Sequence, residues 1–178
     1  LTPWFNGTKH GVSGPTTKLT DGVMGSNGDD AGNSFFYDRA YTPGAFTGDI
    51  GIDLGAIYQI GQVNTYSWHV GYNYGNRANQ KYDLWASDGT AEGFLYTDKT
   101  SNGWVQLTSV ATAPHFGTTF DDGQFGVSIR PETGNSLGSY RYFIFSVYSP
   151  GTTEGGGYGP QDGTFYQEID IVEAVPEP

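Results

Sequence analysis

The feature that most limits what this chain can fold into is a series of short segments with a two-residue period. These segments alternate apolar or β-branched side chains with polar ones, as half-buried strands do. They span residues 49–54, 60–68, 81–87, 104–110, 124–130, 140–148 and 165–173, with a shorter one at 34–38. No segment sustains the 3.6-residue period of a helix, which argues against a helical bundle.

The sequence between these segments is suited to tight turns. Asp-Gly, Asn-Gly and Gly-Asn pairs occupy 88–89, 102–103, 122–123 and 134–135, and such residues accept the backbone angles of turns. Segment 140–148 carries apolar side chains on both faces, which indicates a central strand covered on each side. We therefore predict an all-β fold, a β-sandwich jelly roll of about eight antiparallel strands.

Composition narrows the function classes. The chain has 178 residues, no cysteine and a formal net charge of −11. Its length suits one domain with its own core, and the lack of cysteine excludes a thiolate metal site. Because nucleic acids and anionic membranes attract Lys and Arg, the acidity argues against both as partners. No apolar run reaches the ~18 residues of a transmembrane helix, and we expect a monomer without membrane insertion.

The order of several motifs resembles a known family. The chain reads "LTDG", "IDLG", "VNTYSW", "YDLWASDG", "WVQL", "RYFIFSV" and "EIDIVE" in succession over residues 18–173. This series resembles the coagulation factor 5/8 type C, or discoidin, domain, a group that includes carbohydrate-binding modules of family 32. The final "VPEP" resembles the start of a sorting tag on exported bacterial proteins. The resemblance implies one galactose-binding-domain-like jelly roll over 1–174, a truncated tag at 175–178, and a secreted or cell-surface bacterial location.

The resemblance also implies a buried structural calcium ion. The family's metal ligands map onto Asp21, Ser26 and Glu168, with a main-chain carbonyl near Leu19. Where the family often has Asn or Asp, this chain has Val23, which offers only its carbonyl. Independently of the family, "TDGVMGSNGDD" supplies oxygen ligands on a glycine-rich segment, and calcium accepts six to eight oxygens in irregular geometry.

Sugar binding through end loops is the function that the resemblance implies. The segments 69–80 and 151–160 are rich in glycine and carry aromatic and polar side chains. Aromatic rings pack on the C–H faces of sugars, while His, Arg and Asn bond hydroxyl groups. The predicted sugar contacts are His69, Tyr72, Tyr74, Arg77, Asn79 and Tyr158. Trp68 suits either stacking or the core, His69 could instead cap a turn, and Arg77 could form an ion pair.

Two other functions stay open at this point. "EIDIVE" matches the E-x-D-x-x-E signature of family 16 glycoside hydrolases, in which two carboxylates about 5 Å apart cleave the bond. Glu168 and Asp170 share a strand face, but Glu173 joins them only across a bulge, and the motif lies at the end of the chain. An adhesion or matrix protein of the same fold is the other alternative. We expect a non-catalytic module that binds a polysaccharide or glycan.

Overall fold

The computed structural model describes residues 1–9, 11, 13–25, 35, 44–69, 78–116, 123–150 and 163–175. In chain order, the elements in this part of the chain are β1 (Thr2–Phe5), the 3₁₀ helix η1 (Thr16–Thr20), β2 (Phe46–His69), β3 (Lys81–Ser87), β4 (Val105–Ala111), α1 (Ala113–Phe116), β5 (Gly123–Ile129), β6 (Gly138–Tyr148) and β7 (Tyr166–Glu173). None of the helices in these described ranges is long and apolar enough to span a membrane.

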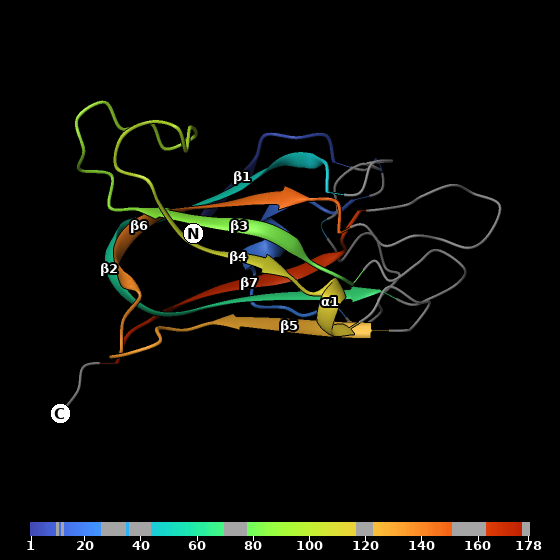
Figure 1. Cartoon of the computed structure of the whole chain (residues 1–178). Coiled ribbons are helices and arrows are strands. Elements are labelled where there is room, and N and C mark those ends of the chain that lie inside the picture. Colours follow the sequence, from blue (N-terminus) through green and yellow to red (C-terminus); the bar gives the residue numbers. More distant parts are fainter. Residues whose placement is uncertain are drawn as a thin grey trace.

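The strands form two layers that share β2 (Figure 1). The first half of β2 lies between β1 and β6, and the sheet continues through β3 to β4. The second half of β2 lies between β5 and β7. All of these pairings are antiparallel. The predicted all-β sandwich is therefore confirmed.

A bend inside β2 moves the chain from one layer to the other. Segments 49–54 and 60–68, predicted as separate strands, belong to this one element. Its pairing with β6 is interrupted between Asp53 and Tyr58, where Gly55 has a φ of +84°. Glycine takes this angle without the steric penalty of a side chain, and the Asp53 carboxylate accepts a hydrogen bond from Gly55 N at 2.8 Å. The bend lets one segment contribute to both layers.

The core lies between the layers. It combines Ile52, Leu84 and Phe143 of one layer with Val63 and Ile169 of the other, each at most 1% exposed. These are the inward positions of the period-two pattern. Burying side chains of this size stabilises the fold by roughly 1.5–3 kcal/mol each, so the alternation sets the register of every pair.

The outer face of β6 is covered as well. Ile144, which points away from the core, is 0% exposed, as predicted for a central strand. The segment 88–104 contributes to this cover: Phe94 packs on Tyr142 with ring centroids 5.0 Å apart, and Lys99 bonds Ser146.

Two differences from the predicted strands have simple causes. β1 was not predicted, because it has only four residues and includes Pro3; proline is tolerated here since β1 is an edge strand. Of the predicted segment 34–38, only Phe35 is described, and it forms an isolated bridge with Tyr166. The other predicted strands match β3 to β7 within two residues at each end.

Candidate functional site

Described residues at the borders of the two predicted sugar-binding segments lie at the same end of the sandwich. β2 ends there at His69, whose backbone pairs with Gly123. The hydroxyl of Thr164, just after segment 151–160, donates to the carbonyl of Asn79 at 2.6 Å. Trp68 N also donates to Phe165 O at 3.1 Å. We call this end, where β2 finishes and β7 begins, the loop end.

A buried polar cluster fixes the base of the loop end. The Gln80 side chain accepts from the Thr65 hydroxyl at 2.5 Å and donates to Ser67 Oγ at 2.9 Å. Tyr82 bonds the same threonine oxygen at 2.9 Å. Gln80 N donates to Thr112 Oγ1 at 2.9 Å. Because buried polar groups are costly unless paired, this mutual satisfaction holds residues 78–80 rigidly to β2 and β3.

Only part of the predicted sugar site can be placed. His69 is the last residue of β2, and its backbone is described. Asn79 is 0% exposed, and its Oδ1 accepts a hydrogen bond from Thr112 Oγ1 at 2.8 Å. The Asn79 side-chain amide is therefore part of the buried polar cluster at the base of the loop end. Tyr72, Tyr74, Arg77 and Tyr158 lie outside the described residues.

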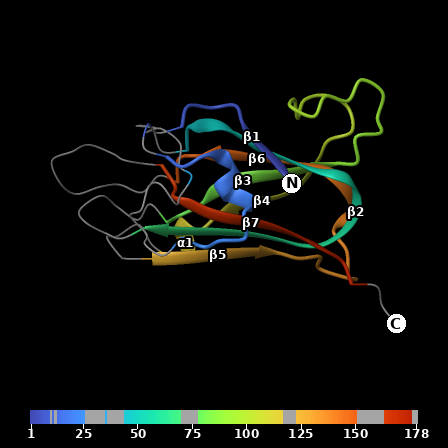
Figure 2. The ribbon, with the colours of Figure 1, turned by 180° about the vertical axis from the view of Figure 1, so that it is seen from behind.

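The predicted calcium ligands Asp21 and Glu168 lie side by side. Packing of η1 against β7 brings them together (Figure 2). Asp21 follows directly on η1, whose Leu19 side chain is in the core. Gly25 N donates to the Gln167 side chain at 2.7 Å, which holds the end of this segment against β7. Two carboxylates distant in sequence thereby share one location.

Glu168 is a buried carboxyl group with one oxygen unpartnered among the described residues. Its residue is 4% exposed, and within the described part of the chain its Oε2 has no hydrogen-bond partner. Burial raises the pKa of Glu168 to about 7; the Gly22 amide lowers it, while the nearby Asp170 and Asp21 charges raise it further. A buried polar atom without a partner calls for an explanation, and a bound cation provides one.

Asp21 is held in its charged form. Burial alone would raise its pKa, but hydrogen bonds from Lys18 and from Val23 N outweigh that effect, so the pKa lies below its ordinary value. Ser26 lies outside the described residues. In the ranges that the structure describes, no three His, Cys, Asp or Glu side chains gather to hold a metal. A metal here would need Ser26 and main-chain carbonyls besides the two carboxylates, which is the oxygen-rich set that calcium accepts.

The carboxylates of "EIDIVE" do not have the geometry of a hydrolase pair. β7 has its extra residue at Gln167, before Glu168, and pairs regularly with β2 from Glu168 to Ile171. Five residues along a strand put Glu168 and Glu173 on opposite faces, roughly 16 Å apart along the strand. A retaining glycosidase needs carboxyl groups about 5 Å apart. This pair therefore does not support the hydrolase alternative.

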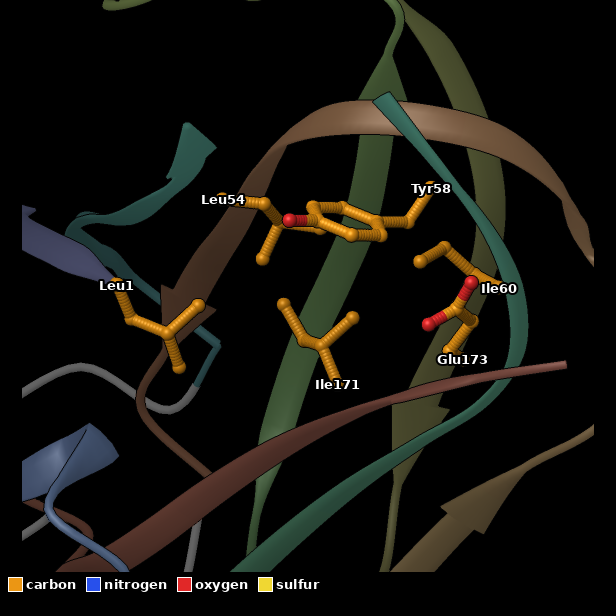
Figure 3. Close-up of a pocket in the computed structure, with 6 residues that line it drawn as sticks. All are labelled: Leu1, Leu54, Tyr58, Ile60, Ile171 and Glu173. Atoms are coloured by element: carbon orange, nitrogen blue, oxygen red, sulfur yellow. The ribbon is translucent and has the colours of Figure 1, made fainter. Parts of the chain in front are cut away.

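Glu173 instead borders a hollow of about 340 Å³ at the opposite end of the sandwich. Figure 3 shows Tyr58 and Leu54 from the bend of β2 on one side and Ile171 on the other, with the Glu173 carboxylate beside Ile60. Leu1 completes the lining. The hollow is remote from the loop end, and apart from Glu173 its walls are apolar or aromatic.

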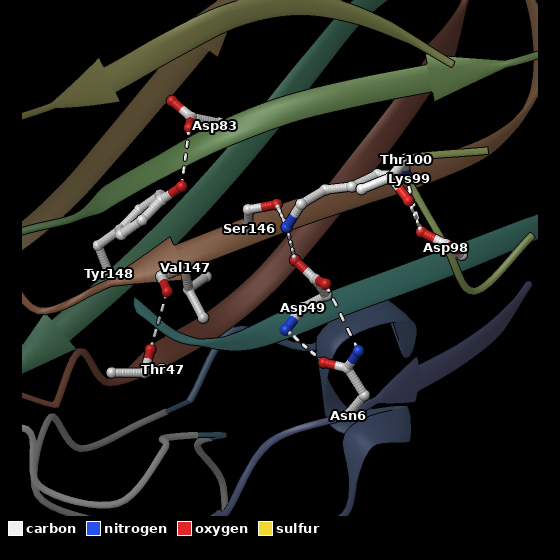
Figure 4. A network of polar contacts seen from close by, with 10 residues as sticks. All are labelled: Asn6, Thr47, Asp49, Asp83, Asp98, Lys99, Thr100, Ser146, Val147 and Tyr148. Atoms are coloured by element: carbon white, nitrogen blue, oxygen red, sulfur yellow. Dashed lines mark hydrogen bonds and ion pairs between the residues drawn. The ribbon is translucent and has the colours of Figure 1, made fainter. Parts of the chain in front are cut away.

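A polar network on the outer face of the first layer was not predicted (Figure 4). Lys99 Nζ lies 2.7 Å from Asp49 Oδ1 and 2.6 Å from Ser146 Oγ. Nearby, Tyr148 Oη donates to Asp83 Oδ2 at 3.0 Å. Burial, followed by the bond to Asp83, raises the pKa of Tyr148 to about 12, so its hydroxyl remains a donor. The sequence signal was slight, because Asp83 and its partner Tyr148 are 65 residues apart in the chain.

No protein-family model and no curated protein matches the sequence. The fold, in contrast, is similar to several solved structures. The CBM32-1 domain from a family 31 glycoside hydrolase from Clostridium perfringens has a TM-score of 0.53 and 13% identity, over 97% of this chain and 93% of that chain. The CBM32 of AlyQ, in complex with 4,5-unsaturated mannuronic acid, also has a TM-score of 0.53 and 13% identity, over 98% and 95%.

The lectin domain of lectinolysin, complexed with Lewis B antigen, is similar to the same degree: its TM-score is 0.53 and its identity 13%, over 98% of this chain and 93% of that chain. Identities this low establish the architecture alone, since one fold hosts many functions. The agreement extends over nearly the full length of each domain. This chain therefore has the discoidin-like β-sandwich fold of family 32 carbohydrate-binding modules.

Proposed function

We propose that this chain is a non-catalytic carbohydrate-binding module that holds a polysaccharide or glycan at its loop end. The observation that carries the proposal is the hydrogen bond from Thr164 to the Asn79 carbonyl, because it joins the bases of the two segments rich in aromatic and polar residues. Solved modules of this fold supply the precedent, including one in complex with galactose. The bound sugar would then lie where both segments can reach it.

The proposed contacts divide by chemistry. His69 and Arg77 supply hydrogen bonds for sugar hydroxyls, and the rings of Tyr72, Tyr74 and Tyr158 pack on the apolar face of a sugar. We leave Asn79 out of this set, because its side chain is buried and bonded to Thr112. The net charge of −11 favours neutral glycans over sulfated ones.

A structural calcium ion completes the proposal. Asp21, Ser26 and Glu168, with the main-chain carbonyl of Leu19, would hold it. When bound, the ion would neutralise the two adjacent carboxylates and join the segment after η1 to β7. The unpartnered Oε2 of Glu168 supports this assignment. Such an ion would stabilise the fold by mass action, because the unfolded chain lacks the site. Export by a bacterium, to its surface or the medium, fits the fold and the "VPEP" sequence.

A glycan array probed with the purified chain, with calcium and with chelator, tests the proposal. We expect binding to a limited set of glycans and no release of reducing sugar from β-glucans, agars or carrageenans. Absence of binding to every glycan in both conditions would contradict the carbohydrate-binding role. Reducing sugar that disappears in Glu168→Gln, while this variant stays folded, would instead support a hydrolase.

A further inference from the structure

A hollow on the outer face of the sandwich carries polar and charged side chains that suit a second sugar subsite. It measures about 260 Å³ and lies over β3, β4 and the end of β6. Its functional groups are the Lys81 ammonium, the Asp83 carboxylate, and the hydroxyls of Ser109 and Tyr148. We call it the outer-face hollow. All of its lining residues belong to the described structure, and none belongs to the calcium pair or to the proposed loop-end contacts.

The carboxylate in this hollow is held in place from two sides. Ser109 Oγ donates to Asp83 Oδ1 at 2.6 Å, and Tyr148 Oη donates to Asp83 Oδ2 at 3.0 Å (Figure 4 shows the latter). Gln106 Nε2 in turn donates to Ser109 Oγ at 2.9 Å. A carboxylate has about four acceptor sites, so Asp83 retains capacity for hydroxyl groups of a ligand. Because its orientation is already fixed, binding costs little side-chain entropy.

Lys81 provides the complementary donor. It lies two residues before Asp83 on the same strand face, and a Cβ built on Gly44 would be 3.1 Å from its Nζ. An acceptor and a three-proton donor two residues apart on one strand face suit two hydroxyls of one sugar unit, each of which both donates and accepts. The opposite charges of the two side chains favour a neutral partner over an anionic one.

An exposed aromatic ring packs against Tyr148, one of the residues that line the hollow. Phe46 is 52% exposed and packs edge to face on Tyr148, with ring centroids 5.7 Å apart. The Lys99 ammonium lies 4.7 Å from the centroid of the Phe46 ring, which holds this ring in place beside β6. Directed polar groups next to a fixed apolar ring form the combination that recognises a pyranose.

The outer-face hollow continues the loop end. Lys81 follows directly on residues 78–80, which close the first proposed binding segment. Tyr148 lies just before the second, and Gly44 N donates to Ser149 O at 3.0 Å beside it. We propose that the outer-face hollow binds a further sugar unit of the same neutral glycan, an inference that rests on the proposed function. The module would then recognise a chain of at least two sugar units.

Titration calorimetry with saccharides of increasing length tests this subsite. The probes are galactose, glucose, mannose and xylose, together with their linear oligosaccharides of two to six residues. In the wild-type chain we expect the preferred oligosaccharide to bind more tightly than its monosaccharide. Lys81→Ala and Asp83→Asn should each weaken oligosaccharide binding about threefold to tenfold, the value of one or two hydrogen bonds, and leave monosaccharide binding unchanged.

Matched controls separate the subsite from general charge effects. Arg130→Ala removes an exposed cation on the other layer, and Asp88→Asn removes a carboxylate that is half-buried, like that of Asp83, but lies in the turn after β3; both should bind like wild type. Equal affinity for short and long saccharides, or wild-type affinity in both hollow variants, would overturn the subsite. Absence of binding to every probe here and to every glycan on the array would instead contradict the proposed function, and the subsite with it. If Asp83→Asn lowers the melting temperature, the affinity of Lys81→Ala alone decides whether the outer-face hollow binds a sugar unit.

Discussion

The buried Glu168 carboxylate should make the stability of the metal-free protein fall as the pH rises. Its pKa in the folded chain is about 7, against an ordinary value of 4.5. Between these two values the unfolded chain has released a proton that the folded protein still holds, so each rise in pH favours the unfolded state. The stability that depends on this proton is complete below about pH 4.5 and is lost as the pH rises through 7. A pKa difference of this size corresponds to about 3 kcal/mol.

Urea unfolding in chelator, at several values between pH 5 and pH 8, measures the effect. The reference is Glu168→Gln, which keeps the shape of the side chain and cannot ionise. The free energy of unfolding of the wild type, minus that of the variant, should fall by about 2–3 kcal/mol across this range. Subtracting the variant removes the contribution of every other ionisable group, because the two proteins share them all. Asp21, whose pKa is lowered, loses its contribution only at more acidic pH.

Calcium added at pH 8 should reverse the loss in the wild type. At a hundred times its dissociation constant a ligand adds about 2.7 kcal/mol, and Glu168→Gln should gain much less. A wild-type-minus-variant difference that stays constant from pH 5 to pH 8 would refute the argument from burial. A difference that depends on pH but does not respond to calcium would support the argument from the buried carboxylate and contradict the proposed calcium site.

Three further variants test other parts of the account. Lys99→Met leaves the nearly buried Asp49 without its cation, and should lower the free energy of unfolding by about 2–3 kcal/mol; unfolding in urea measures this. Gly51→Ala places a Cβ 1.9 Å from Trp4 Cε2, so the Trp4 side chain must move away from β2. The free energy of unfolding should fall by about 1–3 kcal/mol, and the tryptophan fluorescence should change. Arg77→Ala should weaken glycan binding about tenfold or more with an unchanged melting temperature, as calorimetry and thermal melts can check.

The fold could be predicted from the sequence because its strands obey a simple period. In β3, Tyr82, Leu84 and Ala86 are buried as the alternation requires. The join of two predicted strands into β2 could not be predicted, since Gly55 is equally suited to a tight turn and to a bend. β1 was not predicted, because four residues are too few to show a periodic pattern.

The candidate site was less accessible to sequence reasoning. Asn79 was predicted as a sugar contact because the family that the sequence resembles often places His with Arg or Asn in such loops. In the structure its side chain is buried and accepts a hydrogen bond from Thr112. That partner is 33 residues away, so no local pattern reveals it. The outer-face hollow depends on the register of β3, β4 and β6, which only the folded sheet supplies. The proximity of Asp21 and Glu168 was implied by the family resemblance and not by local sequence.

Calorimetric titration of the wild-type chain and two loop-end variants, with the strongest glycan from the array, tests the central claim most directly. The account predicts saturable binding by the wild type. It also predicts about tenfold or greater weakening in Arg77→Ala and Tyr158→Ala, with wild-type affinity in the controls Arg130→Ala and Tyr58→Ala. Wild-type affinity in both loop-end variants would contradict the claim that the sugar binds at the loop end.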